Sequence, residues 1–124
     1  MGKITLDVTE ILDAEGLIIG GLYVEETFKR FGGGEPAYRA EVAAVSGTVS
    51  LVFPAVAPGR YAAAVYHDRN GNRHLDLNFV GIPAEGRGYS KVARAGLAAP
   101  SFSDAGFDHD LETQLTIPLR YPGS

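Results

Sequence analysis

The chain lacks cysteine altogether, and this absence excludes three kinds of chemistry. Without thiols it can form neither a disulfide framework, nor a cysteine nucleophile, nor a zinc site built from thiolates. A chain of 124 residues buries roughly two thirds of the surface that its unfolded form exposes, so it needs no disulfide or metal in order to fold. We therefore expect a single domain over residues 1–124.

Clustered positive charge is also absent. The formal net charge is −4, and no stripe of lysine and arginine could neutralise a phosphate backbone. No apolar run approaches the roughly 18 residues that a membrane-spanning helix requires. We thus expect neither nucleic acid as a partner nor a membrane span. The first residues, MGKITLDV, contain no apolar signal-peptide region, but they resemble the trimmed end of a mature domain and so do not favour the cytoplasm.

Motifs of common enzymes are missing as well: there is no Gly-x-Ser-x-Gly elbow and no Gly-x-x-x-x-Gly-Lys phosphate loop. Ser90, Ser101 and Ser103 lie in predicted loops, with Asp104 and His109 nearby in the sequence, which makes a catalytic triad formally possible. Coincidence among so many polar loop residues explains this better, and Asp104 is typical of a local cap or turn former. We expect a protein that is not an enzyme.

Alternation of apolar and polar residues dominates the chain, and it is typical of strands with one buried face. Three segments show it clearly, namely KITLDVT, TVSLVF and LETQLTIPL. The apolar residues predicted to point inward are Ile4, Leu6 and Val8, then Val49, Leu51 and Phe53, and finally Leu111, Leu115, Ile117 and Leu119. Two further segments, Gly16–Glu26 and Tyr61–Asp68, are apolar on both faces, as central strands tend to be.

Turn signals at Asp13–Gly16, Ser46–Gly47 and Val56–Arg60 space these strands as in a sandwich. We therefore predict an all-β fold, an antiparallel β-sandwich of about seven strands. One short helix is predicted at Val24–Phe31, where apolar residues recur at helical spacing. A long irregular segment, Phe79–Phe107, completes the prediction, and such segments are usually functional or mobile.

The segment HDRNGNRHLDLN places side-chain oxygens at alternating positions. Counted from Asp68, Asn70, Asn72 and Asp76 fall at the third, fifth and ninth positions, with the carbonyl of His74 available at the seventh. A loop that wraps a hard cation points every second residue inward, and Ca²⁺ takes six to eight oxygens at about 2.3–2.6 Å. The pattern therefore predicts a calcium site.

The predicted site is weak and is not an EF-hand. Gly71 stands at the fourth position rather than the sixth, and Phe79 occupies the twelfth position, where an EF-hand has a bidentate glutamate. Two carboxylates alone would give a dissociation constant of roughly 10⁻⁴–10⁻³ M, as in extracellular modules. A third carboxylate from Glu85 or Asp104 could tighten the site.

Two alternatives use the same residues. Asn70-Gly71 is a strong signal for a two-residue hairpin turn, although a turn alone gives no reason for Asn72 and Asp76. Such a hairpin would also bring His67 near His74, and imidazoles favour zinc, copper or nickel over calcium. No His-x-x-x-His pattern supports that second metal site.

The segment Gly59–Ser90, GRYAAAVYHDRNGNRHLDLNFVGIPAEGRGYS, followed by APSFSDAGF, resembles the bacterial domain-of-unknown-function family 2141, and the resemblance covers most of the chain. It implies a small exported β-sandwich of prealbumin-like or carboxypeptidase-regulatory-like type, periplasmic or secreted, with no established activity. The matching positions are His67, Asp68, Asn70, Gly71, Asn72, Leu75, Asp76, Asn78, Gly81, Pro83, Glu85, Gly86, Gly88, Ser90, Pro100, Phe102, Asp104, Ala105 and Phe107. Two departures are Lys91, where we expect asparagine, and ARAGLAA before Pro100.

These observations lead to one functional hypothesis with two alternatives. We expect a non-enzymatic, exported module, monomer or weak homodimer, whose calcium loop (Asp68–Asp76) orders Phe79–Phe107 for contact with a protein partner or a glycan. The first alternative is a transition-metal-binding protein or metalloenzyme that uses His67 and His74. The second is a purely structural module without a ligand.

Overall fold

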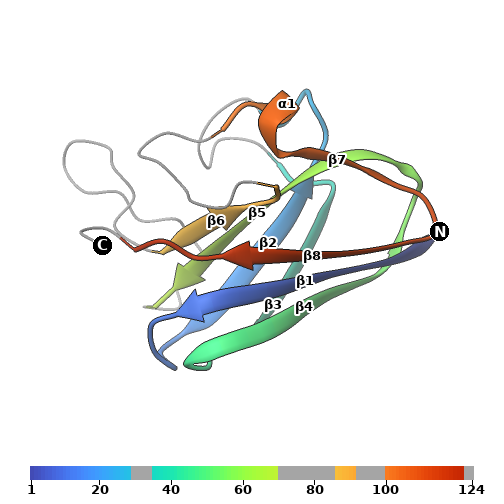
Figure 1. Ribbon diagram of the computed structural model, residues 1–124. Helices are drawn as coiled ribbons and strands as arrows, with labels where there is room; N and C mark the ends of the chain where they lie inside the picture. Colours follow the sequence, from blue (N-terminus) through green and yellow to red (C-terminus); the bar gives the residue numbers. More distant parts are fainter. Residues whose placement is uncertain (29–34, 70–85, 92–99, 122–124) are drawn as a thin grey trace.

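The computed structural model describes residues 1–28, 35–69, 86–91 and 100–121. In these residues the chain forms eight strands and one helix, and the strands make two packed sheets (Figure 1). The elements are β1 (Gly2–Ile11), β2 (Leu17–Tyr23), β3 (Tyr38–Ala43), β4 (Gly47–Val56), β5 (Gly59–Asp68), β6 (Arg87–Tyr89), α1 (Phe102–Ala105), β7 (Gly106–His109) and β8 (Glu112–Pro118). The predicted all-β sandwich is confirmed. The described ranges contain no helix that is long and apolar enough to cross a membrane.

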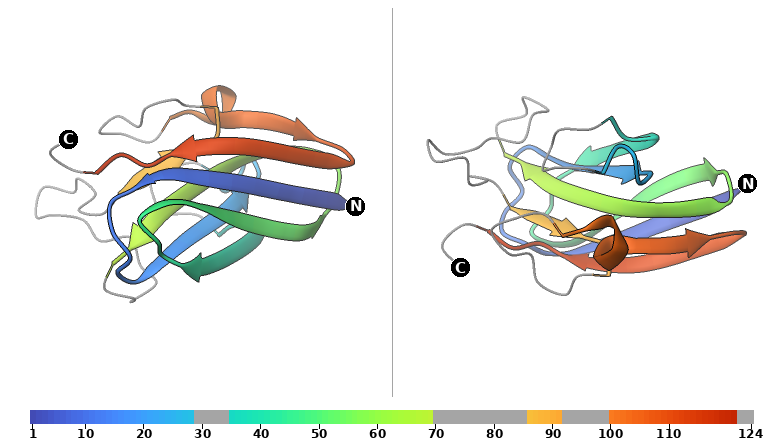
Figure 2. Two further views of the ribbon diagram at one scale, coloured as in Figure 1. Left: turned by 60° about the horizontal axis from the view of Figure 1, so that its bottom comes forward. Right: turned by 90° about the horizontal axis from the view of Figure 1, so that it is seen from above.

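One sheet has the strand order β4-β1-β8, and the other has the order β3-β2-β5-β6, with β7 also paired to β5. Figure 2 shows the two sheets as separate layers. The chain crosses from one layer to the other after β1, β3, β4 and β7. Each of these four connections therefore ties the two sheets together.

The pairing of β8 with β1 departs from the prediction, because it is parallel whereas the sandwich was expected to be antiparallel throughout. The register runs from Lys3 opposite Glu112 to Thr9 opposite Pro118. The backbone at Leu111, just before β8, lies against Gly2, so β8 starts at the end of the sandwich where β1 also starts. Two strands that start at the same end and lie side by side must run in the same direction.

The core lies between the sheets and follows the predicted alternation. Ile4, Leu6 and Val8 of β1 are fully buried, and they belong to one cluster with Ile18 and Val65 of the other sheet. Full burial of such a side chain stabilises the fold by about 1.5–3 kcal/mol. The central, doubly apolar strands β2 and β5 are confirmed as well, since each has pairing partners on both edges.

Leu111 was predicted to point inward, and this prediction is wrong, because its side chain is 77% exposed. The inward row of β8 begins two residues later, at Thr113. Leu111 instead belongs to the turn between β7 and β8, where the alternation of a strand does not apply.

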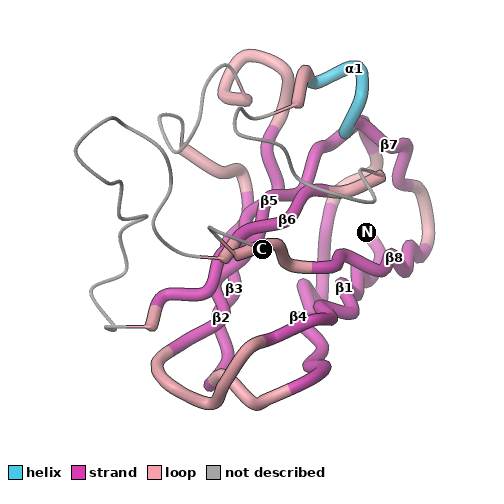
Figure 3. The backbone as a smooth tube through the Cα atoms, turned by 60° about the vertical axis from the view of Figure 1, so that its left-hand side comes forward, coloured by secondary structure: helices cyan, strands magenta, loops and turns pink. Residues whose placement is uncertain are grey.

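The predicted helix at Val24–Phe31 is also wrong over its described part. Val24–Phe28 forms a single turn, in which the N–H groups of Thr27 and Phe28 both donate to the carbonyl of Val24. The short helix is α1, where the hydroxyl of its N-cap Ser101 accepts the N–H of Asp104 at 3.1 Å. Figure 3 shows α1 as the helical segment, in cyan, beside β7.

A second, smaller apolar cluster lies outside the main core, where α1 packs on the five-stranded sheet. The ring of Phe28 meets the rings of Tyr89 and Phe102 at centroid distances of 6.2 and 6.1 Å. Ala62 and Ala105 are fully buried beneath these rings. The small side chain of Ala62 on β5 thus leaves room for α1 to pack closely on the sheet.

Candidate functional site

The predicted calcium ligands are placed unequally by the structure. Asp68 is the last residue of β5 and is 0% exposed, whereas Asp104 is exposed on α1. The remaining predicted ligands lie outside the described residues; they are Asn70, Asn72, His74, Asp76 and Glu85. Within the described ranges, no group of three histidine, aspartate or glutamate side chains is arranged so that it could hold a metal ion. The calcium site therefore stays a prediction.

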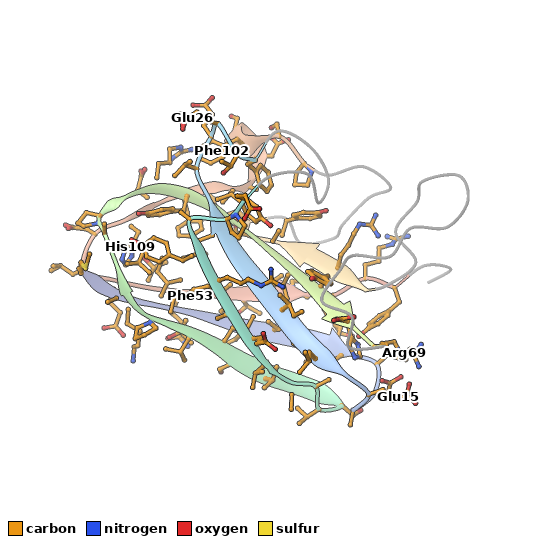
Figure 4. The ribbon with its side chains drawn as sticks, turned by 180° about the vertical axis from the view of Figure 1, so that it is seen from behind. Glu15, Glu26, Phe53, Arg69, Phe102 and His109 are labelled. Carbon is orange, nitrogen blue, oxygen red and sulfur yellow. The ribbon has the colours of Figure 1, made fainter. Side chains whose placement is uncertain are left out.

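The structure does not bring Asp104 to Asp68. Gly106, which directly follows α1, pairs with Ala62 near the start of β5. Ala62 and Asp68 are six residues apart on one strand, which corresponds to about 20 Å. Figure 4 likewise places Phe102 of α1 and Arg69 at opposite ends of the molecule. Of the two carboxylates that could complete the predicted site, only Glu85 lies close to the loop in sequence.

The turn between β1 and β2 packs directly against the end of β5. The side chain of Asp13 accepts the N–H of Glu15 at 3.0 Å, which closes the turn locally. Gly16 has φ +74°, and a Cβ at this position would lie 2.0 Å from the carbonyl oxygen of Asp68. Glycine is therefore required here both by the backbone conformation and by the close approach of Asp68.

Arg69, the residue that follows β5, joins the end of this strand to the turn by two ion pairs. Its guanidinium lies 2.7 Å from Asp13 and 3.0 Å from Glu15, at the end of the sandwich labelled in Figure 4. The backbone N–H of Glu15 and then Arg69 hold the pKa of Asp13 below its usual value, and Asp13 raises the pKa of Arg69. Because these groups are in contact with solvent, the pairs orient the chain more than they stabilise it.

His67 is fully buried at the same end and connects three segments. Its Nε2 lies 2.6 Å from the carbonyl oxygen of Glu15, which can only accept, so Nε2 carries the proton. Its Nδ1 lies 2.6 Å from the hydroxyl of Tyr121, which donates to it when the ring carries its proton on Nε2 alone, and the same hydroxyl accepts the N–H of Leu12 at 3.0 Å. Burial raises the pKa of Tyr121 and keeps this hydroxyl protonated.

This hydrogen bonding disfavours His67 as a metal ligand. An imidazole binds a metal through a ring lone pair, and Nδ1 of His67 faces the hydroxyl of Tyr121.

The backbone pairing of β5 also disfavours the hairpin alternative, because both edges of the strand are occupied at His67. Ile18 pairs with His67 on one side, and the N–H of His67 donates to Gly86 on the other, at 2.8 Å. At His67, β5 has no open edge for the returning strand that the alternative needs.

Two residues of the formally possible triad, Ser90 and His109, have structural partners instead. The buried hydroxyl of Ser90 donates to the carbonyl of Ala105 at 2.6 Å and accepts the N–H of Ala63 at 2.9 Å. The ring of His109 lies 2.8 Å from the hydroxyl of Thr113 and 3.2 Å from the carbonyl of Val56. Neither side chain bonds the other: Ser90 connects two backbone groups, and His109 connects the side chain of Thr113 to the backbone of Val56.

Sequence reasoning missed Arg87 and Tyr121, which help to close this end of the sandwich. The N–H and carbonyl of Arg87 exchange hydrogen bonds with Arg120 at 3.0 and 2.8 Å, linking β6 to the residues after β8. Gly86 and Gly88 could have signalled this approach, because an added Cβ would lie 2.5 Å from the ring of Tyr121 and from the carbonyl oxygen of Pro118, respectively.

The comparison with protein families gives a match over residues 6–116, to the model of domain-of-unknown-function family 2141, described as an uncharacterized protein conserved in bacteria. This match spans all the strands except the first residues of β1 and the last residues of β8. No curated protein and no solved structure matches the chain.

Proposed function

The chain belongs to domain-of-unknown-function family 2141, and from this membership and the geometry of β5 we propose an exported, non-enzymatic module that binds Ca²⁺ through the loop Asp68–Asp76. In this proposal the ion orders the residues after the loop for contact with a protein partner or a glycan. Export is the expectation that the family resemblance brings. The absence of common catalytic motifs from the sequence favours a module over an enzyme.

The burial of Asp68 is the observation that carries the calcium proposal. Its carboxylate is 0% exposed at the end of a central strand, where Leu17 pairs with it and Gly16 packs on its carbonyl. A ligand that the sheet already holds in place loses little conformational entropy when it binds a cation. The other oxygen-bearing residues of the pattern follow within eight positions.

The decisive experiment is a thermal unfolding series in EDTA and then in Ca²⁺, Mg²⁺ or Zn²⁺ separately. Calcium at 100 times its dissociation constant should stabilise the fold by about 2.7 kcal/mol, which raises the midpoint by roughly 10 °C. Asp76→Asn should abolish this shift. Asp104→Asn is the matched control, because it removes an equal charge on α1, and it should keep the shift.

Each other outcome points to a different function. If no ion moves the midpoint, the calcium and transition-metal hypotheses are both rejected, and a structural module without a ligand remains. If zinc moves it and calcium does not, the imidazole alternative replaces the calcium proposal. Export is tested separately by fractionating cells that express the native gene, and recovery of the protein only in the cytoplasm would contradict it.

A further inference from the structure

Strand β4 stands at the edge of the three-stranded sheet, and Figure 1 shows it, in green, at the lower margin of the molecule. It pairs with β1 through five consecutive residue pairs, from Val49 to Phe53, without a bulge. Within the described ranges no strand pairs with its outer edge. Its ten residues include no charged side chain, although charges are one of the means by which proteins protect exposed edges. β4 is therefore a template for a further strand.

The hydrogen bonds of β1 show which backbone groups of β4 point outward. The carbonyl of Thr9 accepts the N–H of Leu119 at 2.9 Å, so odd-numbered residues of β1 face β8. Even-numbered residues of β1 therefore face β4, and the register sets Ile4 opposite Phe53. It follows that the odd-numbered residues of β4 direct their N–H and carbonyl groups toward β1.

The same alternation leaves three residues of β4 with both backbone groups at the outer edge, namely Thr48, Ser50 and Val52. Pro54 is the next residue in this row, and it offers a carbonyl but no N–H. The side chain of Val52 is 46% exposed, and it is the one exposed large apolar side chain of the described strands. A partner at this edge would cover apolar surface and also pair with the backbone groups.

Pro54 decides which register a second copy can take. In an antiparallel pairing centred on Ser50, Thr48 lies opposite Val52 of the partner subunit, and Ser50 lies opposite Ser50 of the partner subunit. All three outward N–H groups of each copy then meet carbonyls, and Pro54 stays beyond the paired span. Registers centred on Leu51 or on Val52 set Pro54 opposite Thr48 or Ser50, respectively, whose carbonyl then lacks a donor. A shift in the other direction places Val52 beyond the start of the partner's β4.

The side chains suit this register on both faces. On the outer face each Val52 packs beside Thr48 of the partner subunit, and β-branched side chains pack well at facing positions of a sheet. On the inner face, the partly buried Val49 lies opposite Leu51 of the partner subunit. Asp7 stands opposite the central residue of β4, but the two copies of its carboxylate are three strand spacings apart. This separation is about 14 Å, which exceeds the screening length of about 8 Å at physiological ionic strength.

We propose that β4 pairs antiparallel with β4 of a second copy, centred on Ser50, and joins the two three-stranded sheets into one six-stranded sheet. Because each copy uses the same strand, the assembly closes at two copies. A single strand gives a small interface, so the dimer is weak and depends on protein concentration. The pairing does not involve the calcium loop and is independent of the proposed function.

Sedimentation equilibrium in EDTA, from about 1 µM to about 1 mM protein, tests the proposal without calcium. The unmodified chain should show a monomer–dimer equilibrium in this range. Two double variants at exposed positions of β4 test the register. Thr48→Lys with Val52→Glu sets opposite charges across the interface twice, whereas Thr48→Lys with Val52→Lys sets like charges there. The second variant should have a dissociation constant at least about tenfold higher than the first.

Thr116→Lys with Glu112→Gln is the matched control for the second variant, because it changes the net charge equally at exposed positions of β8. It should leave the dissociation constant of the unmodified chain unchanged. Circular dichroism establishes that each variant is folded. A chain that stays monomeric at about 1 mM overturns the proposal. Equal dissociation constants for the two folded β4 variants overturn it as well, because the charges would then not face each other.

Amide hydrogen exchange gives a second, residue-resolved test. At high protein concentration the amides of Thr48, Ser50 and Val52 should exchange more slowly than at low concentration. The amide of Leu51, which already faces β1, should not change. Equal protection of the three outward amides at both concentrations would overturn the proposal.

Discussion

At the end of β6, the hydroxyl of Ser90 takes the place that a backbone carbonyl has in a regular ladder. It accepts the N–H of Ala63, while the N–H of Ser90 donates to the carbonyl of the same residue. The next residue, Lys91, has φ +62°. This left-handed conformation disfavours lysine and suits asparagine or glycine. The asparagine expected at this position is thus explained by the backbone rather than by binding.

Replacing Lys91 by glycine should raise the free energy of unfolding by about 0.5–1 kcal/mol, because glycine adopts positive φ without steric cost. Urea denaturation measures the change. Lys91→Ala removes the same charge but keeps a Cβ, so it should bring little gain. An equal gain from both variants would show that charge, not conformation, limits stability here.

The burial of individual strand residues could be predicted from the sequence better than the hydrogen bonds of the buried polar residues. Ile4 and Leu6 are buried because alternation along a strand decides which face they occupy. The role of Ser90 depends on its approach to Ala63, 27 residues away, and no local pattern encodes it. Tyr121 and His67, 54 residues apart, were missed as a pair for the same reason.

Among the elements, β1 forms the centre of its sheet, and a polar connection crosses it on the outer face. Asp7 accepts hydrogen bonds from Ser50 of β4 at 2.7 Å and from Gln114 of β8 at 2.8 Å. Gln114 and then Ser50 hold the pKa of Asp7 below its ordinary value of 3.8. The ionised carboxylate therefore joins three neighbouring strands.

Asp7→Asn should lower stability at neutral pH by less than about 1 kcal/mol, because the site is exposed to solvent. The folded chain has the lower pKa, so this contribution is present above pH 3.8 and is lost as the pH falls through the folded pKa. Unfolding free energies of both proteins, measured from neutral pH down into the acid range, should therefore converge at the acid end. A constant difference at every pH would contradict the prediction.

The alternating strands could be predicted as elements, whereas β6 and the direction of β8 could not. β6 has only three residues, two of them flanking Gly88, and such a length shows no periodicity. The direction of β8 follows from which end of the sandwich the preceding turn reaches, and no pattern within β8 records it. The calcium prediction came from spacing alone, and Asp68 is the one predicted ligand within that loop that the structure describes.

For the whole molecule, the end of the sandwich beside the predicted calcium loop is closed by contacts between distant segments. Tyr121 joins the turn after β1 to β5, through Leu12 and His67. The bridge between Arg87 and Arg120 connects the two sheets beside it. This end is thus fixed by hydrogen bonds, in contrast to the apolar packing of the middle.

Tyr121→Phe should lower the free energy of unfolding by about 1–3 kcal/mol, because Nδ1 of the buried His67 loses its donor. Thermal or urea unfolding measures the loss, and the ¹⁵N shifts of the His67 ring report the changed hydrogen bond. Tyr121→Leu also removes the ring contact with His67 and should cost more. An unchanged stability in Tyr121→Phe would show that the hydroxyl does not close this end.

The parallel pairing of β1 with β8 also governs the order in which the molecule can assemble. Lys3 pairs with Glu112, so β1 cannot complete its sheet until β8 has left the ribosome. Contacts this distant in sequence raise the contact order, and all-β domains of this kind fold in milliseconds to seconds. The three-stranded sheet β4-β1-β8 is therefore completed only after synthesis has reached β8.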